Sequence, residues 1–267
     1  MLLKRIKAYL YYFIAFVFGK VKFKDKFGVV YYLWINTRLR SSILTGCRTD
    51  DRGVIYCIQN IAIFLKLQKK RFTCLDVGAF IGVISLHIAK SLGNSCKLFS
   101  FEANNINFER LQTNSNENSD IAIFPYAVSN QEGISTLVLT DDPGQHYLTQ
   151  HNTTQHTIQE VKTVTINNFC QKNGIEIIDL IKIDAEKHDY EVLLGMSNFL
   201  KNNKVLFIIF EYDTRCQVLL EKYNYQVLFI VKNQKYLTKN KIGTTFLNAV
   251  AVNPEIDIKN VFNKIND

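Results

Sequence analysis

The sequence predicts a doubly wound α/β fold: a mostly parallel sheet covered by helices, ending in an antiparallel strand pair and preceded by a helical segment. Two observations predict it. Apolar stretches of strand character alternate with stretches of helical periodicity from residue 72 to residue 223. The stretch 204–211 (KVLFIIFE) has an uninterrupted apolar centre, as a strand buried on both faces does. The chain has 267 residues, of which 47% are hydrophobic, and three prolines. That suffices for one large core.

The elements follow one another in the order that such a sheet requires. Apolar residues recur every three or four positions in 54–68 (VIYCIQNIAIFLKLQ), which predicts a helix. Residues 134–140 alternate like a half-exposed strand, and residues 141–157 are polar and irregular. The last two strands are expected to pair antiparallel. Further helices are expected at 83–90, 107–114, 190–196 and 214–223, and strands at 72–77, 97–102, 121–126, 161–166, 178–184, 204–211, 225–231 and 244–252.

Positive charge is concentrated in the N-terminal part of the chain. Residues 1–71 hold fifteen Lys and Arg against three Asp, a formal charge of +12, whereas the remaining residues sum to −4. We therefore divide the chain into a basic, apolar helical segment at 1–70 and the main domain at 71–267. The acidic main domain disfavours a nucleic-acid groove, and the basic segment indicates contact with an anionic surface.

The first nineteen residues leave three alternatives open. Lys4, Arg5 and Lys7 precede an apolar run from Ala8 to Phe18, which is shorter than the ~20 residues that span a bilayer. The segment is a helix packed on the domain, an interfacial membrane anchor, or a secretory signal. The six cysteines form no CxxC pair, which indicates buried thiols in a reducing compartment. We expect a cytoplasmic protein. If residues 1–19 are an interfacial anchor, this protein also makes peripheral contact with a membrane through them.

A glycine turn follows the first strand of the main domain, in CLDVGAFIGVISLHIAK. Gly78 and Gly82 allow a sharp turn and a close approach of a ligand to the backbone. Phe80 stands where a dinucleotide fingerprint has its second glycine, and Asp76 would repel a phosphate. An acid there suits a cationic ligand such as S-adenosylmethionine, which carries an ammonium and a sulfonium group. Glu102, at the end of the next strand, is placed to accept hydrogen bonds from ribose hydroxyls.

The chain from residue 72 to residue 212 resembles the FkbM-type methyltransferases. The resemblance rests on LDVGAFIGVISLHIAK, FSFEANNINFERLQTN, PYAVSNQEG, VKTVTINNF, IDLIKIDAEKHDYEVLLG and FIIFEY. It implies a Rossmann-like fold, S-adenosylmethionine as cofactor, and methyl transfer to a hydroxyl of a sugar, glycan or related natural product. The chain departs from the family pattern at Phe80, Lys187 and Asp189, where the family commonly has Asn, Gly and Glu. By resemblance, the cofactor site comprises Asp76, Gly78, Ala79, Phe80, Gly82, Glu102 and Ala103, with Ala127, Val128 and Ser129 near the adenine.

The acceptor side is expected at the ends of the later strands. Asp184 is the predicted base or acceptor-orienting group, with His188 as the alternative base and Glu211 at the adjacent strand end. Glu186 and His151 are expected to contact the substrate.

The polar stretch 141–157 holds His146, His151 and His156, whose spacing of five favours a substrate-covering loop over a metal site. No metal is expected, and the expected partner is a small-molecule or glycan acceptor rather than a nucleic acid. A second hypothesis is a catalytically weak relative that binds a carbohydrate or a partner protein.

Overall fold

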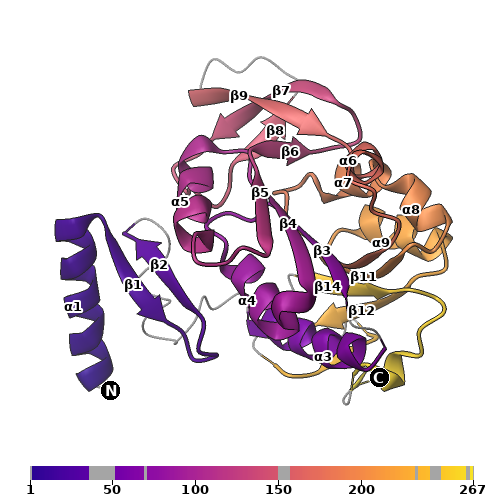
Figure 1. Ribbon diagram of the computed structural model, residues 1–267, viewed down its shortest axis with the longest axis horizontal. Helices are drawn as coiled ribbons and strands as arrows, with labels where there is room; N and C mark the ends of the chain where they lie inside the picture. The colour runs from indigo at the N-terminus through magenta and orange to yellow at the C-terminus, as the bar shows by residue number, and fades with distance from the viewer. Residues whose placement is uncertain are drawn as a thin grey trace.

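The computed structural model describes residues 2–35, 52–68, 71–149, 157–231, 234–240, 248–262 and 265–266. Its centre is a nine-stranded sheet with the order β15-β13-β12-β14-β11-β10-β3-β4-β5, and helices lie on both faces (Figure 1). The described helices are α1 (Leu2–Phe18), α3 (Arg52–Gln68), α4 (Val83–Leu92), α5 (Asn105–Ser115), α6 (Ile166–Lys172), α7 (Asp189–Leu194), α8 (Ser197–Lys201) and α9 (Thr214–Lys222).

The strands of the main sheet confirm the predicted fold class. The five strands β5, β4, β3, β10 and β11 run parallel, while β14 lies antiparallel between β11 and β12. The antiparallel pair expected at the C-terminus is therefore present as β12 and β14. The strands are β3 (Phe72–Val77), β4 (Cys96–Phe101), β5 (Ile121–Phe124), β10 (Ile178–Ile183), β11 (Val205–Glu211), β12 (Gln226–Ile230), β13 (Leu237–Thr238), β14 (Asn248–Val252) and β15 (Ile265–Asn266).

The sheet separates two apolar cores, which explains the uninterrupted apolar run in β11. Phe207 and Ile209 belong to the core that also contains α3 and α4. Ile208 and Phe210 belong to the core on the other face, with side chains of α6 to α9. All four side chains are fully buried, because successive residues of a strand point to opposite faces. A strand in this position has no face left for polar side chains.

The order of the strands reverses between β3 and β10. From β3 the chain continues outward to β4 and β5, and it returns later to β10 and β11 on the other side. Ligands of open α/β sheets bind at such a switch point, beyond the carboxyl ends of the strands. Asp76 of β3 and Lys182 of β10 are paired residues at this point of the sheet.

A second, four-stranded sheet lies at the end of β5, with the order β6-β9-β7-β8 (Figure 1). The single strand expected at 121–126 is in fact divided between the two sheets. Pro125 separates β5 from β6, since proline has no N–H for a strand ladder and restricts the residue before it. The stretch 141–157 also contains a short strand that the sequence did not predict. The small sheet comprises β6 (Tyr126–Val128), β7 (Gly133–Leu139), β8 (Tyr147–Thr149) and β9 (Thr157–Val164).

The N-terminal segment is not helical throughout. Residues 20–34 form an antiparallel hairpin of β1 (Lys20–Lys24) and β2 (Val30–Trp34). The sequence KVKFK alternates with period two, which places Val21 and Phe23 in the core and leaves Lys22 and Lys24 exposed. The helical expectation is therefore wrong for this stretch, while the domain boundary at residue 70 stays a prediction. Within the described ranges, no helix combines the length and the apolarity needed to cross a membrane.

Candidate active site

A cavity of about 410 Å³ opens at the switch point, beside the carboxyl ends of β3, β4, β10 and β11. Its walls come from the main sheet, from the small sheet and from the loop after β7. It brings together most of the residues that the sequence singled out, although they come from five separate parts of the chain. Those in its lining are Asp76, Gly78, Ala79, Phe80, Glu102, Ala103, Ala127, Val128, Asp184, Glu186 and Glu211.

Glu102 follows β4 and is only 8% exposed. Its Oε2 accepts the backbone N–H of Phe80 at 2.8 Å, and its Oε1 accepts the backbone N–H of Asn104 at 2.9 Å. Burial raises the pKa of Glu102 to about 7, and the negative charge of Asp76 adds to the rise, against the effect of the two N–H donors. The carboxyl group is thus fixed in position, and near pH 7 its protonated and ionised forms are both populated.

The two glycines of the turn are required by contacts with other parts of the same chain. Gly78 has φ +72°, and a Cβ there would collide with the backbone oxygen of Asp184. Gly82 has φ +85°, and a Cβ there would lie 2.7 Å from Cδ1 of Leu111 on α5. The turn is therefore tight because strand ends and helices approach its backbone. Phe80 between them has φ 53°, a left-handed conformation that non-glycine residues seldom adopt.

Asp76 is fully buried at the end of β3. Its Oδ2 accepts a hydrogen bond of 2.5 Å from the hydroxyl of Ser85 on α4, which also lies 2.9 Å from the hydroxyl of Ser100 on β4. One carboxylate oxygen is therefore occupied by a hydrogen bond inside the fold. The residue still lines the cavity, so its predicted contact with a cationic ligand stays a prediction.

Lys182 is a site residue that the sequence reasoning missed. It is only 5% exposed within β10, and its Nζ donates to Oδ2 of Asp184 at 2.6 Å. The signal was a single cation inside the apolar run IDLIKID, since lysine is seldom buried without a partner. The ion pair fixes the Asp184 carboxylate at the mouth of the strand.

Three further carboxyl groups surround this ion pair. Burial raises the pKa of Glu186 to about 7, and the charges of Asp184 and Glu211 add to the rise. Burial and the charge of Asp184 also raise the pKa of Glu211. Asp189 is 3% exposed, and its two carboxylate oxygens accept the backbone N–H groups of Ala185 at 2.8 Å and Glu211 at 3.0 Å. It therefore joins the loop after β10 to the end of β11.

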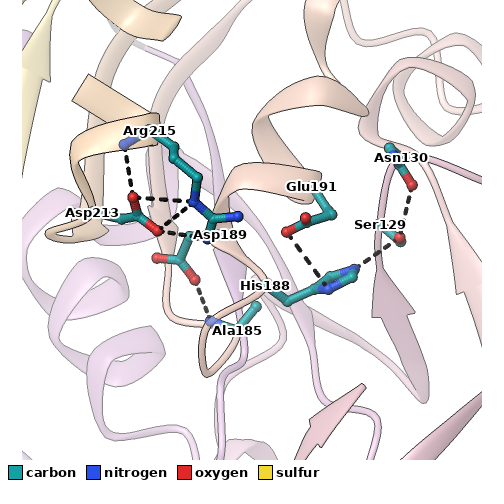
Figure 2. A network of polar contacts seen from close by, with 8 residues as sticks. All are labelled: Ser129, Asn130, Ala185, His188, Asp189, Glu191, Asp213 and Arg215. Atoms are coloured by element: carbon teal, nitrogen blue, oxygen red, sulfur yellow. Dashed lines mark hydrogen bonds and ion pairs between the residues drawn. The ribbon is translucent and has the colours of Figure 1, made fainter. Parts of the chain in front are cut away.

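His188 lies outside the cavity lining, although its predicted role as the alternative base requires a place in the cavity. Its Nε2 lies 2.9 Å from the hydroxyl of Ser129, and its Nδ1 lies 3.7 Å from Oε2 of Glu191 (Figure 2). Ser129 is likewise absent from the lining, as is Gly82, which caps α4. The histidine thus connects the start of α7 to the end of β6.

The loop after β7 covers one side of the cavity. Its Pro143 accepts, through its backbone oxygen, a 2.7 Å hydrogen bond from the amide of Asn107 on α5. His146 lines the cavity, and its Nδ1 accepts the backbone N–H of Thr140 at 3.1 Å. Burial lowers the pKa of His146, which favours the neutral ring. His151 and His156 lie outside the described residues, and the described part of the chain holds no group of metal-ligating side chains.

Comparison with known proteins identifies the family. The model of the methyltransferase FkbM domain matches residues 76–236, which span the glycine turn, Glu102 and the acidic groups. The chain belongs to the FkbM methyltransferase family. A hexuronic acid methyltransferase, AglP of Haloferax volcanii, is 29% identical over 152 residues, which are 57% of this chain and 60% of that protein.

Solved structures with a similar arrangement include other methyltransferases. Methyltransferase FkbM from Methylobacillus flagellatus is 14% identical, over 80% of this chain and 52% of that one, with a TM-score of 0.46. The S-adenosylmethionine-dependent methyltransferase from Agrobacterium tumefaciens is 10% identical, over 88% and 70% of the two chains, with a TM-score of 0.47. This FkbM family member thus spans between 52% and 70% of the length of these relatives.

The cavity of this FkbM family member fits S-adenosylmethionine, the methyl donor of such enzymes. Its volume falls in the range of ~300–1,000 Å³ that is usual for sites of small molecules and cofactors. Its wall combines the buried carboxyl group of Glu102 with the apolar side chains of Ala127, Val128 and Leu137. A carboxylate suits ribose hydroxyls and an apolar wall suits an adenine ring, and both groups belong to this cofactor.

Proposed function

We propose that this chain is an S-adenosylmethionine-dependent O-methyltransferase that acts on a hydroxyl group of a sugar or glycan. The observation that carries the proposal is the division of one cavity into two sides. Glu102 and the apolar wall lie on the side of β4 and β6, and three acidic groups lie at the ends of β10 and β11. The first side suits the cofactor, and the second suits a hydroxyl that must be oriented and deprotonated.

The cofactor, when bound, supplies an electrophilic methyl group on its sulfonium. Glu102 is proposed to accept hydrogen bonds from the ribose hydroxyls, because its side chain is already held by the N–H groups of Phe80 and Asn104. A carboxylate fixed in advance loses little conformational freedom when the ligand binds. The predicted contacts of Asp76 with the cationic part of the cofactor form part of the same proposal.

The acidic groups are proposed to have separate roles, one that orients the acceptor hydroxyl and one that accepts its proton. Asp184 is held by Lys182 and is suited to orient the acceptor hydroxyl toward the methyl group. Glu186 has a pKa of about 7 and lines the same cavity, which suits a group that takes up the hydroxyl proton near neutral pH. This division differs from the sequence-based hypothesis, which gave the role of base to Asp184 or His188.

The charge of the acceptor side favours an uncharged sugar. Asp184, Glu186 and Glu211 meet there, and the buried cation Lys182 is already paired with Asp184. A carboxylate on the acceptor would be repelled by these groups. We therefore propose a neutral sugar hydroxyl, although the relative from Haloferax volcanii is named for hexuronic acid.

The test is transfer of a labelled methyl group from S-adenosylmethionine to a panel of matched acceptors. Neutral hexosides and the corresponding hexuronic acids should be compared under identical conditions. The proposal is supported if the neutral sugars carry the label and the label resists alkaline hydrolysis, as a methyl ether does. Label only on the uronic acids contradicts the choice of acceptor, and cofactor binding without transfer to any fraction of a glycan extract would favour a binding protein instead.

A further inference from the structure

Helix α1 has two apolar faces. Tyr11, Ile14 and Ala15 face the hairpin and the core, and the ring of Tyr11 lies edge-on to Phe23 with 6.2 Å between centroids. The opposite face, here called the outer stripe, is exposed: Tyr9 and Phe16 are each 73% accessible. The outer stripe consists of Ile6, Tyr9, Leu10, Phe13, Phe16 and Val17.

The spacing of the outer stripe shows that it is one continuous surface. Its members follow one another at intervals of three, one, three, three and one residues, which keeps them on one side of an α-helix. A helix on the surface of a soluble domain normally presents polar residues there. A continuous exposed apolar surface of this kind marks a site of interaction. In Figure 1, α1 lies at the edge of the molecule, separated from the main sheet by the hairpin.

The charge of the N-terminal segment indicates the kind of partner. Lys4, Arg5 and Lys7 lie in the first two turns of α1, and β1, which follows the helix, carries Lys20, Lys22 and Lys24. A second copy of the chain carries the same positive charge on this segment, so a dimer through α1 would bring two like-charged segments together, which repulsion disfavours. An anionic lipid surface attracts such a cluster and accepts the apolar side chains.

We propose that the outer stripe of α1 inserts into the interface of an anionic lipid bilayer. The helix then lies in the membrane plane with the apolar side chains of the outer stripe below the headgroups, and the positive charge of the segment attracts it to the anionic surface. Tyr9 and Tyr12 have the amphipathic rings that prefer the headgroup level, and both are exposed. The buried face of the helix keeps its contact with the hairpin, so binding needs no unfolding. In this proposal α1 is both a packed helix and an interfacial anchor, which are two of the three alternatives left open by the sequence.

The test is co-sedimentation of the full chain with vesicles of phosphatidylcholine, alone or mixed with phosphatidylglycerol. The variant is Phe13→Glu with Phe16→Glu, and the matched control is Ile63→Glu with Leu67→Glu on α3, where the two side chains are 64% and 79% exposed. All four side chains are exposed, so both variants should melt like the wild type. Tyr9→Ser with Phe13→Ser is a milder second variant.

The wild type and the control should bind mixed vesicles at least roughly tenfold more tightly than either stripe variant. Added salt should weaken the binding, because anionic headgroups contribute to it. Absence of wild-type binding, or equal binding by the folded stripe variants, overturns the proposal. So does a wild-type dimer in analytical ultracentrifugation that the stripe variants dissociate, since the stripe would then bind a second copy.

Discussion

The backbone N–H of Phe80 donates to Oε2 of Glu102 at 2.8 Å and joins the glycine turn after β3 to the end of β4. This bond couples the left-handed residue in the turn to the acid after the next strand. The carboxylate compensates the strained backbone, and the turn in return holds the carboxylate at the cavity wall. This part of the cavity wall and the turn are therefore one structural unit.

Proton release should accompany cofactor binding near neutral pH. The pKa of Glu102 is raised to about 7, and in the proposed complex ribose hydroxyls donate to its ionised form. The affinity for S-adenosylmethionine should therefore increase as the pH rises toward about 7, and level off above it. Calorimetric titrations in buffers of different ionisation enthalpy should detect the released proton near pH 7 and none at alkaline pH. Glu102→Gln should bind without this pH dependence, and an unchanged proton release in Glu102→Gln would contradict the assignment.

Glu186→Gln should lower kcat by roughly 10²–10⁴-fold, which is the usual contribution of a positioned general base. The wild-type rate should rise with pH through about 7, where Glu186 loses its proton. In the variant this rise of the rate with pH should be absent. Cofactor affinity should change little in the variant. The measurement is methyl transfer at saturating cofactor over a range of pH.

His188→Ala is the control for this assignment, because the ring contacts Ser129 outside the cavity lining. It should retain most of the turnover. Asp184→Asn should lower kcat because the acceptor loses its orienting group, yet keep the pH dependence of Glu186. Near-normal turnover of Glu186→Gln together with a flat pH profile of His188→Ala would return the role of base to the histidine.

Gly78→Ala should destabilise the fold far more than Gly93→Ala. Both glycines have φ +72°, and Gly93 has ψ −165°, a region that is essentially confined to glycine, so both substitutions strain the backbone by roughly 1–3 kcal/mol. The Cβ at Gly93 meets nothing within 4 Å, whereas the Cβ at Gly78 would collide with the Asp184 backbone. Gly78→Ala should therefore cost more than about 4 kcal/mol or abolish folding. Urea unfolding of both variants measures the difference, and equal costs would contradict the packing described here.

The free energy of unfolding should fall as the pH rises from about 4 to about 7. Burial raises the pKa of Asp189 from 3.8 to about 7 and that of Glu102 from 4.5 to about 7. Between these values the folded chain binds more protons than the unfolded chain, so deprotonation favours unfolding. Asp189→Asn should show a shallower pH dependence in denaturant titrations than Glu117→Gln, which changes an exposed acid. An equal slope in the two variants would contradict this origin.

Much of the fold follows from the sequence, because hydrophobic periodicity records which faces are buried. The run 204–211 was recognisable as a central strand since both of its faces lie in a core. The hairpin at 20–34 was missed because KVKFK is short and follows a long apolar helix. The division of 121–128 was missed because one proline, Pro125, moves the chain from one sheet to another without changing the apolar pattern.

The candidate site was predictable where strand ends carry polar residues, as at Glu102 and Asp184. The role of the glycines was not, because the atoms that exclude a Cβ at Gly78 belong to a segment more than a hundred residues away. The same holds for His188, which follows a strand end but turns toward Ser129 instead of the cavity. Sequence order gives the strand end, and only the packing gives the direction of the side chain.

Calorimetric titration with S-adenosylmethionine of the wild type and of folded Glu102→Ala tests the central claim most directly. The claim is that the cavity is a methyl-donor site organised by this carboxylate. Removal of charge-assisted hydrogen bonds worth roughly 1.5–3 kcal/mol each should weaken binding more than about tenfold. Saturable binding by the wild type, reduced by at least that factor in Glu102→Ala, is the predicted result. No binding by the wild type, or equal binding by both proteins, would contradict the account.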